Sequence, residues 1–135
     1  VSLSALQQGK RMERWKRIAV SAAKQCGGAV IPSIFSPCNF NELSENLAKV
    51  LSSESPQLML VEPSASCDCL SMSELERPDN REAALIIGPE GGWTTEEVEG
   101  GSTIFKLVTL GSRTFRAEVA PAVALASLFT AWKEF

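Results

Sequence analysis

Histidine is absent from this 135-residue sequence, and cysteine occurs four times. Without an imidazole, the chain lacks the commonest general base at neutral pH and every mixed Cys/His zinc site. The closest cysteines, Cys67 and Cys69, form a C-x-C pair rather than the C-x2-C spacing of a usual zinc half-site. We therefore expect no metal, and free thiols of the kind found in a reducing compartment.

Long apolar runs are also missing. No stretch approaches the roughly 18 consecutive apolar residues of a membrane span, and the first residues lack the basic start and apolar core of a secretory signal. The hydrophobic share is 44% and the charged share 21%, as in an ordinary globular domain. We expect no membrane partner and one domain over residues 1–135, with room for a single core.

Positive charge is concentrated at one end of a chain whose net charge is −3. The acidic balance argues against a general nucleic-acid binder, but lysine and arginine dominate residues 1–25, and acidic residues dominate 39–82. A basic end on an acidic body could contact a polyanion locally. A solvated helix face accounts for the same pattern, so charge alone leaves both interpretations open.

The first regular element is expected to be a helix over residues 9–26. Apolar side chains recur there at three- and four-residue spacing, and Gly27 and Gly28 follow as a helix end. The expected apolar stripe consists of Met12, Trp15, Ala19, Ala22 and Cys26.

Two further elements are expected before residue 55. Residues 29–34 form an apolar run that Pro32 interrupts, which predicts a short strand or an edge strand. A second helix is expected over residues 41–53, with Asn39 or Asn41 as its N-cap.

Three apolar runs, at residues 57–61, 83–87 and 104–110, are short and continuous, which is typical of strands buried on both faces. Residues 63–81 are rich in serine, proline and acids, so we expect a loop with at most one helical turn.

Two helices are expected in the second half of the chain. Thr94 or Thr95 caps a short acidic helix that Gly100 and Gly101 should end. A final apolar helix is expected over residues 119–133. Alternating strands and helices predict an α/β fold with a mostly parallel sheet flanked by helices.

Two loops follow predicted strands, where open parallel sheets bind their ligands. Residues 88–92 hold three glycines, which let a ligand approach bare backbone. Residues 110–118 place two arginines and a carboxylate before a helix. A tight turn and a surface ion pair are the plain alternatives. A phosphate loop is disfavoured, because no Lys-Ser/Thr follows the glycines and Glu90 would repel a phosphate. A dinucleotide site is disfavoured, because the pattern is not G-x-G-x-x-G.

Three blocks of sequence, in the same order, carry a resemblance to a known family. They are Arg-Met-Glu-Arg-Trp with Ala-Ala-Lys-Gln-Cys and Val-Ile-Pro (residues 11–32), Ile-Gly-Pro-Glu-Gly-Gly-Trp (87–93), and Leu-Gly-x-Arg with Arg-x-Glu (110–118). Over nearly its whole length, the chain resembles the bacterial-type 16S ribosomal RNA uridine-N3 methyltransferases, which have the SPOUT fold. The resemblance implies a C-terminal trefoil knot, one of the rare exceptions to unknotted topology.

The resemblance also implies a cofactor, S-adenosylmethionine, held mainly by backbone groups of the loops after three strands. Glycine and leucine fit this task, because adenine needs a flat apolar slot with a few backbone donors and acceptors. The implied cofactor-binding residues are Leu60, Val61, Glu62, Ile87, Gly88, Pro89, Gly91, Gly92, Leu110, Gly111, Phe115 and Arg116.

For catalysis, the family's reaction requires loss of the uridine N3 proton. Arg116 is the expected electrostatic stabiliser of the resulting anion, and Glu118 is expected to orient it or accept the proton. Arg11, Arg14 and Arg17 are expected to contact RNA phosphates, with a solvated helix face as the alternative.

The resemblance implies further properties of the whole protein. The implied partners are small-subunit ribosomal RNA and a second copy of the chain, in the cytoplasm of a bacterium or in a chloroplast or mitochondrion of a eukaryote. We expect the chain to lack the family's N-terminal RNA-binding β-barrel domain and the first strand and helix of its methyltransferase domain.

The chain also departs from the family at single positions: Gly28 replaces an arginine, Phe115 a leucine, and Ala117 and Val119 replace threonines. A non-catalytic SPOUT-fold fragment that binds cofactor or RNA, or dimerises, is therefore the alternative. A generic α/β nucleotide-binding protein would need a phosphate site that the sequence does not provide.

Overall fold

A computed structural model describes residues 5–63 and 68–134. The chain forms two compact units, Val1–Leu43 and Ser44–Phe135, and each is described by itself. Cys67 lies outside the described residues, so the C-x-C pair has no structural counterpart here.

The first unit consists mainly of α1 (Ala5–Gln25), the predicted N-terminal helix with an earlier start. Its end is as predicted: Gly27 has a φ of +67°, and the Gly28 amide donates to the Ala23 carbonyl at 2.9 Å. The predicted apolar stripe is only partly correct. Met12 and Ala19 are half-buried, Ala23 is the buried member, and the other predicted stripe residues, Trp15, Ala22 and Cys26, are exposed.

The strand predicted at residues 29–34 is wrong. No residue of this run pairs with a strand in the described structure, and Val30 is 80% exposed. Apolar residues beside a proline favour an extended chain, but a strand also needs a partner that offers its hydrogen-bonding edge.

The helix predicted over residues 41–53 is correct only in its first part. It consists of the 3-10 turn η1 (Phe40–Glu42) and the short helix α2 (Leu43–Leu47), followed by turns. Asn39 is the residue at its start, and its amide donates to the Glu42 carboxylate at 3.3 Å.

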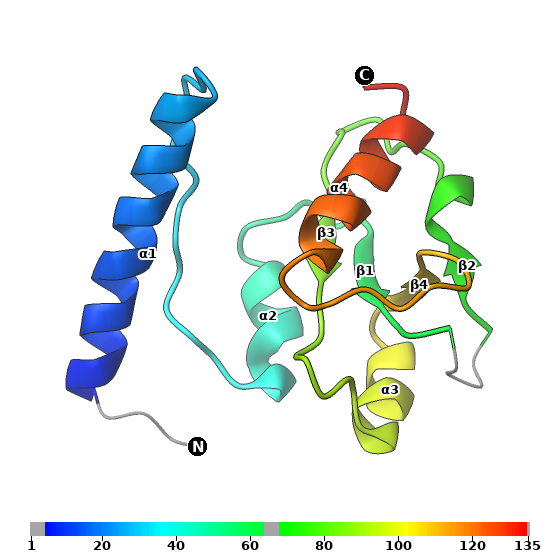
Figure 1. Cartoon of the computed structure of the whole chain (residues 1–135). Coiled ribbons are helices and arrows are strands. Elements are labelled where there is room, and N and C mark those ends of the chain that lie inside the picture. Colours follow the sequence, from blue (N-terminus) through cyan, green and yellow to red (C-terminus); the bar gives the residue numbers. More distant parts are fainter. Residues whose placement is uncertain (1–4, 64–67, 135) are drawn as a thin grey trace. The chain divides into compact units, whose positions relative to one another are not determined.

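A parallel four-stranded sheet organises the second unit (Figure 1). Its strands are β1 (Gln57–Leu60), β2 (Leu70–Ser71), β3 (Ala84–Ile86) and β4 (Lys106–Thr109), in the order β2-β4-β1-β3. The predicted α/β class with a mostly parallel sheet is therefore confirmed, and the three predicted strands in this unit are present.

The edge strand β2 lies where a loop was predicted. Only two of its residues pair, Leu70 opposite Val108 and Ser71 opposite Thr109, so it is too short to leave a periodic pattern in the sequence. The 3-10 turn η2 (Met72–Glu74) follows directly and accounts for the single helical turn expected there.

The short helix α3 (Thr95–Ser102) begins as predicted. Thr94 is its N-cap, and a capping box joins Thr94 and Glu97 through hydrogen bonds of 3.2 and 2.9 Å. The predicted end is wrong, because Gly100 and Gly101 lie inside the helix. Gly101 is buried there, and a Cβ at this position would lie 2.5 Å from the Met59 sulfur, so close packing on β1 explains this glycine.

The last helix, α4 (Ala120–Ala131), packs on the sheet and forms the core with it. Leu58 of β1 and Val108 of β4 are fully buried and meet Ala124 and Leu128 of α4. The core thus fixes β1 and β4 in the middle of the sheet, with their carboxyl ends at one edge.

Within the described residues, no helix is long and apolar enough to cross a membrane.

Two adjacent glycines of α3 give a matched test of this packing. Gly100→Ala should raise the free energy of unfolding by about 0.5–1 kcal/mol, because the position is open and alanine favours helix. Gly101→Ala should lower it by about 1 kcal/mol, because overpacking against Met59 outweighs the same helix gain. Urea unfolding followed by circular dichroism measures both, and equal effects of the two substitutions would contradict the packing described.

Candidate functional site

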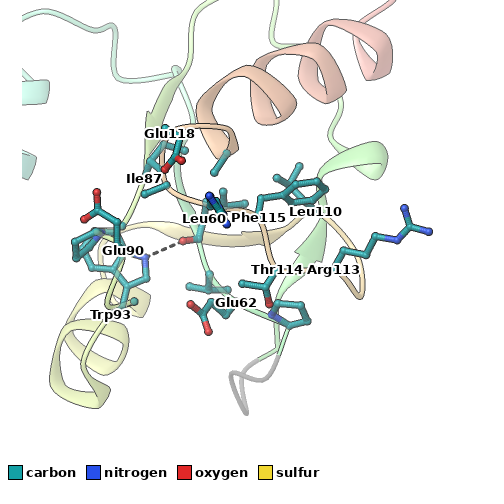
Figure 2. Close-up of a pocket in the computed structure, with 18 residues that line it drawn as sticks. Leu60, Glu62, Ile87, Glu90, Trp93, Leu110, Arg113, Thr114, Phe115 and Glu118 are labelled. Atoms are coloured by element: carbon teal, nitrogen blue, oxygen red, sulfur yellow. Dashed lines mark hydrogen bonds between the residues drawn. The ribbon is translucent and has the colours of Figure 1, made fainter.

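The loops after β1, β3 and β4 converge on one pocket of about 370 Å³ (Figure 2). These strands are neighbours in the sheet, so their carboxyl ends lie at the same edge. The volume falls within the range of small-molecule and cofactor pockets. The pocket is lined by Leu60, Val61, Glu62, Pro63, Ile87, Gly88, Pro89, Glu90, Gly92, Trp93, Leu110, Arg113, Thr114, Phe115, Arg116, Ala117, Glu118 and Ala120.

Most residues that the sequence indicated for the cofactor line this pocket. The structure brings together Leu60, Val61, Glu62, Ile87, Gly88, Pro89, Gly92, Leu110, Phe115 and Arg116. Gly91 and Gly111 are not among the lining residues. Gly111 has a φ of +90°, so it serves the turn after β4 rather than the pocket wall.

The glycine-rich turn after β3 is shaped by two different requirements. Gly92 has a φ of +73°, and its amide donates to the Pro89 carbonyl at 3.0 Å, which closes the turn. Gly88 is bare for another reason: a Cβ there would lie 2.9 Å from the indole ring of Trp93. The sequence predicted that these glycines make room for a ligand. At Gly88, the space beside the backbone is instead occupied by the Trp93 ring.

Trp93 joins two of the three loops and was not among the predicted site residues. Its indole N–H donates to the Leu60 carbonyl at 2.8 Å, across 33 positions of sequence (Figure 2). Its ring lies over Gly88, so one side chain ties the end of β1 to the turn after β3. The sequence does show an aromatic residue directly after a glycine-rich turn, but it gives no indication that this residue binds the Leu60 carbonyl.

The predicted catalytic pair, Arg116 and Glu118, lies on the loop that leads into α4, and both side chains are exposed. The Arg116 carbonyl accepts from the Val119 and Ala120 amides, each at 2.9 Å, which fixes the backbone of this turn. Within the described residues, no salt bridge joins either side chain to a neighbour, so the surface ion pair considered as an alternative is not formed. Figure 2 shows Arg113 reaching away from the other labelled residues.

The three candidate RNA-contacting arginines, Arg11, Arg14 and Arg17, all lie on α1 and are exposed. Their three-residue spacing keeps them near one another along the helix. They belong to the first unit, whereas every lining residue of the pocket belongs to the second.

Metal-ligating side chains do not gather in the part of the chain that the structure describes. No group of three or more Cys, Asp or Glu residues with suitable placement occurs there. Cys26, Cys38 and Cys69 are free thiols.

Comparison with known proteins gives a consistent result. A family model described as an RNA methyltransferase domain matches residues 1–129. Among curated proteins, the chain is 33% identical over 121 residues to ribosomal RNA small subunit methyltransferase E of Synechocystis, covering 87% of this chain and 38% of that protein. The protein of the same name from Buchnera aphidicola is 30% identical over 129 residues, covering 93% and 46%.

Two solved structures share the fold. Ribosomal RNA small subunit methyltransferase E of Neisseria gonorrhoeae, bound to S-adenosyl methionine, has a TM-score of 0.80 at 29% identity, covering 98% of this chain and 52% of that chain. A Legionella pneumophila protein with the cofactor SAM bound has a TM-score of 0.77 at 30% identity, covering 98% and 51%. This chain therefore spans about two fifths to one half of the length of these relatives.

Trp93→Phe tests the link between the loops. The phenyl ring can still lie over Gly88, but the Leu60 carbonyl loses its donor, so the free energy of unfolding should fall by about 1 kcal/mol. Trp15→Phe, in the exposed part of α1, is the matched control and should change it by less than about 0.5 kcal/mol. Chemical unfolding followed by far-UV circular dichroism measures both variants, and equal losses would contradict a linking role for Trp93.

Proposed function

Because this chain belongs to the RNA methyltransferase domain family, we propose that it is the cofactor-binding part of an S-adenosylmethionine-dependent enzyme that methylates N3 of a uridine in small-subunit ribosomal RNA. The observation that carries the proposal is the convergence of three loops, from β1, β3 and β4, on one pocket. The names of the relatives support the class of RNA, and the sequence motifs support the uridine target.

The residues of the pocket fit the proposed cofactor. Leu60, Ile87, Leu110 and Phe115 offer an apolar surface for an adenine ring, and the turn after β3 offers backbone groups beside it. Carboxylates on the same lining can face the positively charged groups of the methionine part. The two solved relatives with this cofactor bound support the same assignment.

The chemistry divides between cofactor and protein. When bound, S-adenosylmethionine supplies an electrophilic methyl group. The protein's task is to make uridine N3 nucleophilic, because this nitrogen is protonated at neutral pH. We assign to the Arg116 guanidinium the stabilisation of the negative charge on the base. The Glu118 carboxylate, two residues further along the same loop, accepts the N3 proton.

The arginines of α1 are proposed to bind RNA phosphates. Arg11, Arg14 and Arg17 are exposed and lie close together on one helix, so they can hold a phosphate backbone without reading its sequence. A ribosomal RNA substrate would place the protein where ribosomes are assembled, which is the cytoplasm in a bacterium and an organelle for a bacterial-type ribosome in a eukaryote.

We also propose that the chain forms a homodimer through α4. One face of this helix packs on the sheet, and the other is apolar yet exposed. Leu125 and Phe129 on that face are 45% and 39% exposed. A helix that is apolar all round is normally covered on both sides, and a second copy supplies an identical apolar surface.

The C-terminal knot stays a proposal as well. The last strand in sequence, β4, lies between β1 and β2 rather than at an edge of the sheet. Insertion of a late strand into the middle of a sheet supports the threading that the family resemblance implies.

A second candidate function is a non-catalytic module that binds the cofactor, binds RNA or dimerises. It is favoured by departures from the family pattern beside the proposed catalytic residues, where Phe115 replaces a leucine and Ala117 and Val119 replace threonines. The two candidates differ in one measurable property, because only the first predicts methyl transfer.

Transfer of a labelled methyl group to small-subunit ribosomal RNA lacking the modification tests the proposed function. We expect N3-methyluridine in the RNA digest, and we expect Arg116→Gln to lower the rate by about 100-fold at saturating cofactor, because a charge-stabilising group is removed. Arg113→Gln, on the same loop but directed away, is the matched control and should retain most of the rate. Cofactor binding without any transfer would favour the non-catalytic module.

Leu125→Glu tests the proposed dimer. A buried carboxylate at the centre of an apolar interface should shift the chain to monomer, with at least a tenfold weaker association in analytical ultracentrifugation. Ile104→Glu changes an apolar residue outside α4 that is at least as exposed, at 54%, and should leave association unchanged. Monomer in the unchanged chain, or dimer in both variants, would contradict the proposed interface.

A further inference from the structure

The pocket has an excess of negative side chains. Three carboxylates line it, from Glu62, Glu90 and Glu118, against the two guanidinium groups of Arg113 and Arg116, a formal balance of −1. Figure 2 shows that the carboxylates arrive from three different loops, after β1, β3 and β4. Negative charge is therefore distributed around the pocket rather than gathered on one loop.

In the part of the chain that the structure describes, these carboxylates have no salt-bridge partner. Within the described residues, a salt bridge is present between Arg77 and Glu134, at 3.0 Å and away from the pocket, and none involves a lining residue. Of the two lining arginines, Arg113 reaches away from the other labelled side chains in Figure 2. A ligand with positive charge would therefore meet uncompensated carboxylates, whose attraction is greatest where water is displaced.

Glu62 is the carboxylate with a distinctive place in the pocket wall. It follows β1 closely and lies against the turn after β3, where a Cβ on Gly92 would come within 3.1 Å of its Oε1 atom. Gly92 has a φ of +73° and no side chain, so the turn leaves room for this carboxylate. The adjoining loops are held together by the hydrogen bond from Trp93 to the carbonyl of Leu60, which lies two residues before Glu62.

We propose that Glu62 is a specificity-determining residue that makes the pocket prefer S-adenosylmethionine, with its positive sulfonium, over S-adenosylhomocysteine, whose sulfur is neutral. This inference rests on the proposed function. The two molecules share adenine, ribose, amine and carboxylate, so shape and hydrogen bonding to these parts cannot separate them. A carboxylate near the sulfur attracts one form and gains nothing from the other. The pocket would then release the used form more readily than the fresh one.

The size of the effect follows from the exposure of Glu62. Its carboxylate is open to solvent, so its attraction for a cation is screened by water and salt. Exposed ion pairs contribute up to about 1 kcal/mol, which corresponds to a preference of up to about fivefold.

Isothermal titration calorimetry of the full chain with both molecules tests the proposal. Glu62→Gln keeps the shape of the side chain but removes its charge, so S-adenosylmethionine should bind about three- to fivefold more weakly, and S-adenosylhomocysteine should change less than about twofold. Sinefungin, which carries a protonated amine in place of the sulfonium, should behave like S-adenosylmethionine. Raising the salt concentration should reduce the difference.

Glu99→Gln is the matched control, because it removes the same charge from an exposed site on α3 outside the pocket. It should leave the ratio of the two dissociation constants unchanged, and Glu62→Asp, which keeps the charge, should restore part of the preference. Thermal unfolding establishes that each variant is folded.

The possible outcomes separate this inference from the proposed function. Equal weakening of both molecules by Glu62→Gln, or no change in either, would overturn the role of Glu62 while leaving the proposed function intact. If Glu99→Gln changed the ratio of the two dissociation constants as much as Glu62→Gln does, the effect would come from overall charge. That result would also overturn the role of Glu62. Failure of the unchanged chain to bind either molecule would overturn the proposed function, and this inference with it.

Discussion

The parallel pairing of β1 with β3 on one side and β4 on the other is the constraint on which the site depends. The pairing places Met59 opposite Ile86 and Leu107, so the three strands end close to one another. Burial of Leu58 and Val108 under α4 fixes this register, because a shift by one residue would turn these side chains to the other face. Every loop that lines the pocket is a direct continuation of one of these strands.

The pocket is stabilised by non-covalent contacts between its loops as well as by the sheet beneath. The Trp93 indole donates to the Leu60 carbonyl, and its ring packs against Gly88. Gly92, which has no side chain, leaves room for the Glu62 carboxylate. The turn at Arg116 is closed by two backbone hydrogen bonds at the start of α4. Backbone fixed in this way favours binding, because less conformational freedom is lost when a ligand arrives. We propose that this pocket binds the cofactor and that it prefers the cofactor form with the positively charged sulfur.

Much of this arrangement was predictable from sequence. The strands at residues 57–61, 83–87 and 104–110 were each indicated by a short apolar run between turn residues, and all three are present. Errors occurred where the outcome depends on a distant partner. Residues 29–34 have the composition of a strand but no strand partner among the described residues, β2 pairs through only two residues, and Gly101 stays in α3 because Met59 packs against it.

The sequence by itself determined the parallel α/β class, the position of the two loops and the family resemblance, because these depend on local periodicity and on residue types at fixed spacing. Only the tertiary structure decided that Gly91 and Gly111 lie off the pocket lining, that Trp93 binds the Leu60 carbonyl, and that the pocket carboxylates have no salt bridge within the described residues. These features join residues from loops after different strands. No local pattern encodes such distances, since they arise only when the sheet brings the strand ends together.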